Sequence, residues 1–348
     1  MRRTLFTILG LLIMTTACQT EEEETSLTPE EINFELEEDA GFRIDTVSMP
    51  SGDVLQGDDT SAEITGQWLD EPQTVWIGES LRDPLGNWID FPAYEQRPED
   101  GEDNAFTIQT PPAFDESPAV SGPYTHVLSI WDQDPSQDGA VRLMRAETNE
   151  ALTYFNQRER FSDWPDTAGW YAADHAIGQT SFEPGQVSFD DGQNRLLIHK
   201  DSGIGGEIRT EERFSYGSYQ IAMRVPDHPG TLTGFFFYET PDFHHEIDIE
   251  VMNNPSGEVW FTTYQGGQER HASKETYDFD PTDGVHIYRI DYFPDYVAFF
   301  INGEEHARFE DGYSHEPMQL MVNYWEPTWL RGARDMDQGT LYIESIMY

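Results

Sequence analysis

The residues of this chain best suited to chemistry are three carboxylates, Glu246, Asp248 and Glu250, which alternate with aliphatic residues in segment 245–251. Successive side chains of a β-strand point to opposite faces. A strand here would therefore place the three acids on one face and the aliphatic side chains in a core. Like charges held this close disfavour one another's ionisation, so their pKa values should separate. Two such carboxyl groups, one protonated and one ionised, are what hydrolysis of a glycosidic bond requires.

A solvated strand face is the alternative interpretation of the same three acids. Asp and Glu make up 66 of the 348 residues. At that density, on the order of two alternating windows of three acids are expected by chance. The acids alone therefore do not define an active site, and the surrounding segments must decide.

The charge of the chain limits its partners. The formal net charge is −46, and the only lysines are Lys200 and Lys274. Such a surface repels nucleic acid, anionic lipid and sulfated or uronic polymers, and it suits a neutral ligand. We expect a neutral polysaccharide substrate and no nucleic-acid partner. An excess of acid with few lysines also indicates adaptation to high salt, where screening removes self-repulsion.

The first residues are typical of an export signal. Segment 1–17 combines two arginines with a short apolar run, and Cys18, the only cysteine, follows it. The arrangement resembles a bacterial lipoprotein signal, which implies lipidation of Cys18, an outer-membrane anchor and a secreted, cell-surface protein. An ordinary secretory signal cut after Ala17 is the alternative. Residues 18–40 are acidic and predict a disordered linker.

Two all-β domains are expected after the linker. Short strand-like runs separated by turns predict a small β-sandwich accessory domain over residues 41–150. Its tryptophans include candidate sugar-stacking platforms, with core packing as the alternative for most of them. Residues 151–348 again alternate strands and turns without helical periodicity, which predicts a large two-sheet sandwich. Its predicted strands include 194–199, 218–224, 233–238, 259–264, 286–290 and 297–301. The dipeptide Asn302-Gly303 predicts a tight hairpin.

The region from about residue 155 to 348 resembles glycoside hydrolase family 16, whose fold is a β-jelly roll. Segment 246–250 matches the family signature in the form without an inserted residue, which is the form of the licheninases and the xyloglucan enzymes. Five other blocks match in order and spacing, namely 206–224, 235–238, 293–303, 321–325 and 341–348. The resemblance covers over half of the chain.

The resemblance assigns catalytic roles to the three acids. It implies that Glu246 is the nucleophile, that Glu250 is the acid/base, and that Asp248 assists between them. A retaining glycosidase holds its two carboxyl groups about 5–5.5 Å apart. Four residues of strand span about 13 Å at the backbone, so Glu246 and Glu250 must lean toward each other over a bent, twisted strand.

The resemblance also implies the residues that hold sugar and one weak metal ligand. Glu207 and Arg209 match sugar-binding positions, with a cross-strand ion pair as the alternative. His244 replaces the tryptophan that licheninases carry two residues before the nucleophile, and Thr262 replaces an asparagine. Glu344 matches an acid that often binds structural calcium. The remaining candidates, with core packing as an alternative for the first, are Phe236, Tyr238, Tyr264, Asn323 and Trp325.

We therefore expect a monomeric, retaining endo-β-glucanase that acts on mixed-linkage 1,3-1,4-β-glucan and requires no cofactor. Laminarin, xyloglucan or a marine galactan are alternative substrates, and transglycosylation is an alternative reaction. A carbohydrate-binding protein without catalysis is the alternative from another class, because fold does not fix function.

Overall fold

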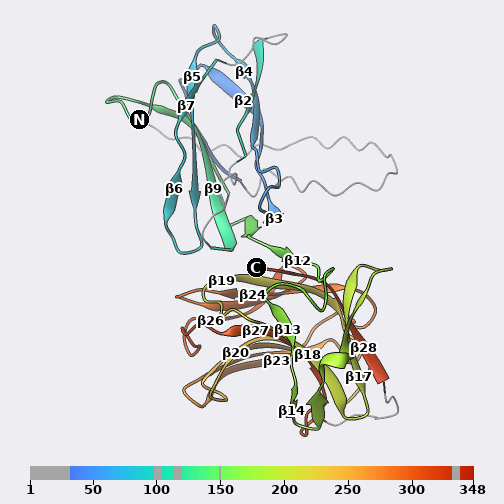
Figure 1. The fold of residues 1–348 in the computed structure, drawn as a ribbon. Helices are drawn as coiled ribbons and strands as arrows, with labels where there is room; N and C mark the ends of the chain where they lie inside the picture. The colour runs from blue at the N-terminus through green and yellow to red at the C-terminus, as the bar shows by residue number, and fades with distance from the viewer. Residues whose placement is uncertain (1–31, 98–103, 113–119, 149, 331–337) are drawn as a thin grey trace. The chain divides into compact units, whose positions relative to one another are not determined.

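The computed structural model describes residues 32–97, 104–112, 120–148, 150–330 and 338–348. The chain divides into two compact units, Met1–Asn156 and Gln157–Tyr348, and each consists of β-strands (Figure 1). Among the described residues, no helix has the length and apolar character needed to cross a membrane.

The first unit is a small β-sandwich, as the sequence predicted. Its larger sheet has the central order β1-β10-β9-β11-β3, with β5 on the other side of β9 and with β6 and β7 paired to β5. These strands span Ile32–Leu36 (β1), Gly52–Leu55 (β3), Val75–Arg82 (β5), Trp88–Asp90 (β6), Tyr94–Gln96 (β7), Gly122–Trp131 (β9), Arg142–Thr148 (β10) and Leu152–Phe155 (β11). The smaller sheet consists of Phe42–Ser48 (β2), Glu63–Trp68 (β4) and Ala105–Gln109 (β8). A core that includes Phe42, Ile64, Trp68, Ile77 and Leu128 fills the space between the sheets.

The boundaries of this unit differ from those predicted. Strand β1 lies inside the predicted 18–40 linker, where Ile32 is buried and β1 pairs with β10. The acidic and polar residues that alternate with its apolar ones concealed this strand. Strand β11 lies beyond the predicted end at residue 150. Its Leu152 and Tyr154 are fully buried and bring it into the first unit.

The second unit is the predicted two-sheet sandwich. The front sheet has the order β13-β18-β27-β20-β21-β22-β23. These strands span Trp170–Ala172 (β13), Ile204–Thr210 (β18), Leu232–Glu239 (β20), His245–Met252 (β21), Glu258–Gln265 (β22), Glu269–Thr276 (β23) and Gln319–Trp325 (β27). All neighbours in this sheet run antiparallel, so each hydrogen-bonded pair can alternate a buried with an exposed face.

The back sheet has the order β16-β17-β28-β19-β24-β25-β26. These strands span Val187–Asp190 (β16), Arg195–Asp201 (β17), Gly217–Arg224 (β19), His286–Tyr292 (β24), Val297–Ile301 (β25), Glu304–Phe309 (β26) and Gln338–Met347 (β28). Short pieces at the margins are Arg158–Glu159 (β12), His175–Ile177 (β14), Thr180–Phe182 (β15) and the 3-10 turn Pro184–Gln186. The predicted hairpin joins β25 to β26, with φ of 50° at Asn302 and 83° at Gly303.

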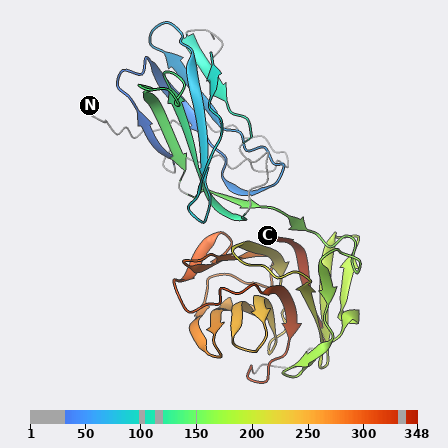
Figure 2. The ribbon, with the colours of Figure 1, turned by 60° about the vertical axis from the view of Figure 1, so that its left-hand side comes forward.

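The core of the second unit fixes which face of the front sheet is free. In Figure 1, β20 and β23 lie in one layer and β19 and β24 in the other, and Figure 2 shows the unit from a second direction. Fully buried aliphatic and aromatic residues of both sheets meet between the layers. They include Ile247, Ile249 and Phe261 of the front sheet and Ile290 and Ile343 of the back sheet. The opposite face of the front sheet is therefore available for a site.

Candidate active site

Strand β21 carries the three acids on the free face of the front sheet. Its aliphatic residues 247, 249 and 251 are fully buried in the core. The β-branched Ile and Val side chains favour a strand and pack well on a pleated surface. Since side chains alternate, Glu246, Asp248 and Glu250 share the other face, which we call the carboxylate face.

Strands β20 and β22 flank the acids and complete three rows across the sheet. The pairing register places one residue of each strand directly beside each acid. The row partners are Tyr238 and Tyr264 beside Glu246, Phe236 and Thr262 beside Asp248, and Gly234 and Trp260 beside Glu250. Phe236 is half-buried, whereas its neighbours 235 and 237 belong to the core, so Phe236 lies on the carboxylate face.

Burial raises the pKa values of all three acids, and repulsion from nearby carboxylates adds to each rise. Burial raises the pKa of Glu246, and the charges of Glu250 and Asp242 raise it further. Asp248 is buried beside both glutamates, so its pKa also lies well above the usual range. Burial raises the pKa of Glu250 to about 7, with Lys274 opposing the rise and Glu269 adding to it. The set therefore retains protons near neutral pH, where isolated carboxyl groups would be ionised.

Hydroxyl groups form hydrogen bonds with one of the three acids and with two carboxylates near them. Thr262 Oγ1 donates a hydrogen bond to Asp248 Oδ2 at 2.6 Å. Because this bond favours the ionised form, it opposes part of the rise in the pKa of Asp248. Tyr238 donates to Asp242, and the hydroxyl of Tyr264 lies 3.4 Å from Glu269 Oε2.

A polar network on β18 and β27 adjoins the acids. Glu207 Oε1 accepts from Arg209 Nε at 2.5 Å, and Glu207 Oε2 accepts from Asn323 Nδ2 at 3.2 Å. Asn323 Oδ1 in turn accepts from the backbone N–H of Gly234 at 3.2 Å. Glu207 and Arg209 thus form an ion pair, but within one strand, β18, and not between two strands as the alternative had it. It connects through Asn323 to the row of Glu250, so an ion pair and a place beside the carboxylate face are compatible here.

The segment that enters β21 contains His244. Its carbonyl accepts from Gly266 N at 3.3 Å, and a Cβ on Gly267 would stand 3.1 Å from its Nε2, so the ring packs on that turn. The residue before it, Phe243, has φ of 63° and is 53% exposed. A bulky residue in the left-handed region is strained. The ring of Phe243 lies 5.3 Å from that of Tyr264, which brings an unpredicted aromatic side chain to this end of the site.

Trp325, the last residue of β27, is the remaining residue predicted to bind sugar. The alternation of this strand places it on the same face as Asn323. A Cβ on Gly178 would stand 2.7 Å from the Trp325 ring, so the indole packs directly on that glycine. This contact holds the ring in place, which a stacking surface for a sugar requires.

Sequence reasoning missed a tryptophan and lysine cluster beside Glu250. Trp260 stands next to Glu250 in the register. The ring of Trp329 stacks on it at 5.0 Å, and Lys274 Nζ lies 4.2 Å from the Trp260 ring centre. The alternation shared with Tyr264 on the same predicted strand could have revealed Trp260. Lys274 and Trp329 lie in segments without apolar alternation and gave no such signal.

Two predicted residues do not join this site. Glu344 is exposed on β28 of the back sheet. Among the described residues, no group of three or more Asp, Glu, His or Cys side chains could hold a metal ion, so the calcium assignment stays a prediction. Cys18, the predicted lipidation site, lies outside the described residues.

The arrangement is suited to double displacement at an acetal carbon. Of two neighbouring carboxyl groups with raised pKa values, one can attack as the ionised nucleophile while the other donates its proton to the leaving oxygen. Aromatic and hydrogen-bonding side chains around them can hold sugar rings. A β-sandwich whose free face carries such carboxyl groups among aromatic side chains has the arrangement of a glycoside hydrolase.

Comparisons with known proteins agree with that class. Residues 177–346 match the family model described as Glycosyl hydrolases family 16. A beta-glucanase of Acetivibrio thermocellus is 29% identical over 171 residues, which cover 46% of this chain and 51% of the relative. A xylanase/beta-glucanase of Ruminococcus flavefaciens is 29% identical over 244 residues, which cover 67% of this chain and 29% of the relative. The chain thus spans about half or less of these curated relatives.

Solved structures match the second unit. A prokaryotic beta-1,3-1,4-glucanase (lichenase) from a mouse hindgut metagenome has a TM-score of 0.50 and 27% identity, with 55% of this chain and 97% of that chain covered. The Bacillus licheniformis beta-glucanase shares the fold, with a TM-score of 0.51 at 22% identity over 55% of this chain and 96% of that chain. The second unit belongs to glycosyl hydrolases family 16, as its motifs predicted.

Proposed function

We propose that this protein is a retaining endo-β-glucanase whose most suitable substrate is mixed-linkage 1,3-1,4-β-glucan. The observation that carries the proposal is the row of three acids on β21 with raised pKa values. A surface used only for binding gains nothing from three acids held close together, whereas a double displacement uses both an ionised and a protonated carboxyl group. The names of the relatives and of the lichenase neighbour support the choice of β-glucan.

In the proposed reaction, Glu246 attacks the anomeric carbon as a carboxylate while Glu250 donates its proton to the departing glycosidic oxygen. The covalent glycosyl–Glu246 ester is then hydrolysed by water that Glu250 deprotonates, which restores both groups and retains the configuration. Asp248 lies between them and shares a proton or a hydrogen bond with Glu246. The aromatic side chains of Tyr238, Tyr264 and Trp325 would hold the sugar rings on either side.

The test is release of new reducing ends from barley β-glucan, laminarin, xyloglucan and agar, each at low and at molar salt. We expect the highest rate on barley β-glucan. Glu246→Gln should lower kcat by about a thousandfold or more, because the nucleophile is lost. Glu304→Gln, at an exposed glutamate on β26 of the back sheet, is the matched control and should leave kcat unchanged. If the wild-type protein binds glucan but never cleaves it, the proposal that it is an enzyme is wrong.

The linkage and the acceptor are separate outcomes of this assay. His244 stands where a tryptophan was expected and packs on the Gly267 turn, so the linkage preference can differ from that of the licheninases. If laminarin, xyloglucan or agar is cut faster than barley β-glucan, that polymer replaces mixed-linkage glucan as the proposed substrate. Products longer than the starting chains in the presence of excess oligosaccharide would indicate transglycosylation.

We also propose that the protein is a monomer, exported and anchored to the cell surface through lipidated Cys18. Globomycin-sensitive processing, and its loss on Cys18→Ser, would test the anchor.

A further inference from the structure

The first unit carries a second aromatic surface, on the outer face of its larger sheet. The register places Trp76, Trp131 and Arg142 side by side on β5, β9 and β10. One step along the strands, Gly78, Ser129 and Arg145 form the next row. The alternate residues of these strands, among them Ile77, Ile130 and Met144, lie in the core. We call the outer surface formed by residues 76, 78, 129, 131, 142 and 145 the Trp131 face.

Glycine at position 78 provides a flat support for the Trp131 indole. A Cβ at this position would stand 3.2 Å from Trp131 Nε1 and 3.6 Å from its Cδ1. The indole therefore lies against the bare backbone of β5. Trp131 and Trp76 are only half-buried and do not belong to the core cluster. The expectation that some of these tryptophans act as platforms thus has a structural basis at Trp131, whereas Trp68 lies in the core.

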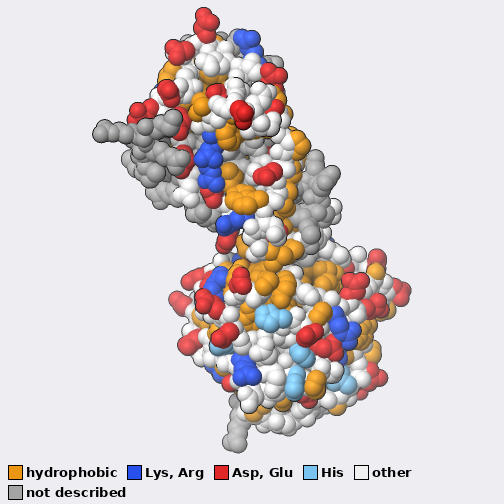
Figure 3. Space-filling model, turned by 90° about the vertical axis from the view of Figure 1, so that its left-hand side faces the viewer, with side chains coloured by type: hydrophobic (Ala, Val, Ile, Leu, Met, Phe, Trp, Pro, Cys, Tyr) orange, Lys and Arg blue, Asp and Glu red, His pale blue; other side chains and the backbone are white. Residues whose placement is uncertain are grey.

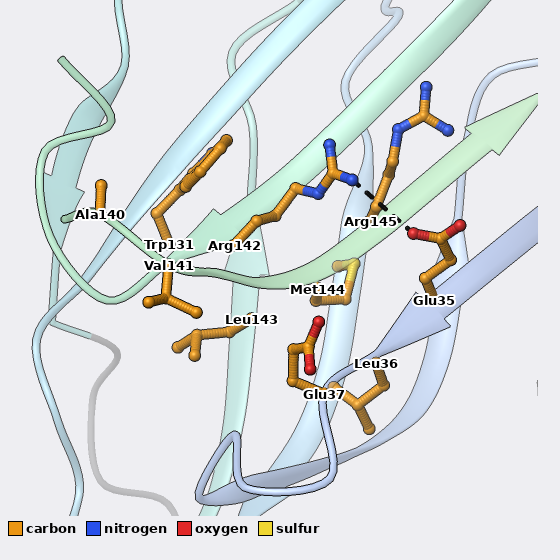
Figure 4. Close-up of a pocket in the computed structure, with 10 residues that line it drawn as sticks. All are labelled: Glu35, Leu36, Glu37, Trp131, Ala140, Val141, Arg142, Leu143, Met144 and Arg145. Atoms are coloured by element: carbon orange, nitrogen blue, oxygen red, sulfur yellow. Dashed lines mark ion pairs between the residues drawn. The ribbon is translucent and has the colours of Figure 1, made fainter. Parts of the chain in front are cut away.

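Two hollows adjoin this indole. One, of about 450 Å³, extends from Trp131 and the two arginines toward Val141 and Leu143 (Figure 4). The other, of about 390 Å³, shares Trp131 and both arginines and extends toward Trp88 and Asp90 of β6. Trp88 is 51% exposed. Two hollows that share one flat ring fit an extended ligand better than a compact one.

The charges of the Trp131 face favour a neutral ligand. Arg142 Nη2 lies 3.7 Å from Glu35 Oε2, and Arg145 forms an ion pair with Glu147. Figure 4 shows both arginines on the same side of the sheet as Trp131. With carboxylates beside each guanidinium, the face has no excess of positive charge, and the chain as a whole is strongly negative. An anionic polymer would be repelled.

We propose that the Trp131 face binds a neutral polysaccharide chain, with one sugar ring stacked on the indole of Trp131 and hydroxyl groups hydrogen-bonded by the arginines and by Asp90. A flat apolar ring with fixed polar groups beside it is the combination that recognises a pyranose, which has an apolar C–H face and a polar rim. That the bound chain is a β-glucan rests on the function proposed for the second unit. Since both units belong to one chain, binding here would raise the local concentration of substrate.

The experiment measures retention of the full chain in native gels that contain barley β-glucan, with Glu246→Gln as the parent so that the polymer is not cut. Trp131→Ala should raise the apparent Kd by about tenfold, as expected for the loss of one stacked ring. Trp131→Phe should recover most of the retention. Gly78→Val, which suits a strand but fills the indole's support, should weaken retention without removing any core side chain. Leu69→Ala is the control, because the Leu69 side chain is 65% exposed on the same unit, and it should not change the retention.

The outcomes separate this inference from the proposed function. If Trp131→Ala and Gly78→Val fold normally by circular dichroism and migrate like the parent, the Trp131 face does not bind β-glucan and the inference is wrong. Trp325→Ala in the same parent should retain part of the binding through the Trp131 face. A protein that never cuts glucan, yet loses retention with Trp131→Ala, would refute the catalytic proposal and leave this one standing. Retention in dextran sulfate gels that also depends on Trp131 would contradict the choice of a neutral ligand.

Discussion

Individual residues around Glu250 set when it can act as an acid. One cation and one carboxylate of β23 act on the pKa of its carboxyl group in opposite directions. Lys274 Nζ also lies 3.7 Å from Glu269 Oε2. Lys274 is one of only two lysines in a chain of net charge −46. In so acidic a chain, a cation near the proposed acid/base opposes the rise in the pKa of Glu250 that burial causes.

Replacement of these two residues should move the alkaline limb of the pH profile in opposite directions. Removing the cation, as in Lys274→Met, disfavours the ionised form of Glu250 and raises its pKa, so the proton is kept to higher pH. Glu269→Gln removes a negative charge and lowers the pKa. We expect shifts of about half a pH unit each way in the alkaline limb of kcat/KM, which reports the free enzyme. Two shifts of the same sign, or none, would contradict the assignment of Glu250 as the acid.

At the scale of elements, the alternation of apolar and polar residues made most of the second unit predictable. Strands β19, β20, β21, β22 and β25 lie where the sequence placed them, because one face of each must enter the core. Strand β23 was missed because it is largely exposed at the margin of the front sheet and has almost no apolar residues. For the same reason Lys274 and Glu269, which it carries, could not be predicted as part of the site.

The site residues that lie on paired strands could be predicted from the sequence, whereas those that come from loops could not. The sequence placed Glu246, Asp248 and Glu250 on one face through the period of two, and neighbouring strands supplied the aromatic rows. Phe243 and Trp329 come from segments outside the strands, and their approach to Tyr264 and Trp260 depends on the path of the chain between strands. Local periodicity carries no information about that path.

Close packing between β20 and β27 connects the backbone to the polar network. A Cβ at Gly234 would stand 2.8 Å from Asn323 Oδ1 and 3.2 Å from the Phe236 ring. Gly234→Ala should therefore displace Asn323 and break its hydrogen bond to Glu207, with kcat/KM on β-glucan lower by about tenfold. Gly284→Ala is the matched control, because nothing lies within 4 Å of a Cβ there. A Gly234→Ala enzyme with normal kcat/KM would show that Asn323 does not position substrate.

At the scale of the whole molecule, the surface charge dominates. Figure 3 shows acidic side chains distributed over the visible face of both units, with fewer basic ones. Each unit has an apolar core of its own, so folding must bring many like charges together around each core. This self-repulsion is a cost that grows as screening weakens. It also makes both proposed sugar sites selective for uncharged polymers at low ionic strength.

The thermal stability of the whole chain should therefore rise with salt. Between about 0.1 M and about 1 M sodium chloride the Debye length falls from about 10 Å to about 3 Å, which removes most repulsion between exposed carboxylates. We expect Tm at pH 7.5 to increase by several degrees over this range, measured by differential scanning fluorimetry. At about pH 4.5, where many carboxyl groups carry protons, the same addition of salt should have a much smaller effect. Sucrose stabilises by exclusion from the surface, so its effect should be similar at the two pH values. A salt effect that is equally large at both would show that exclusion, rather than the screening of −46 charges, stabilises the protein.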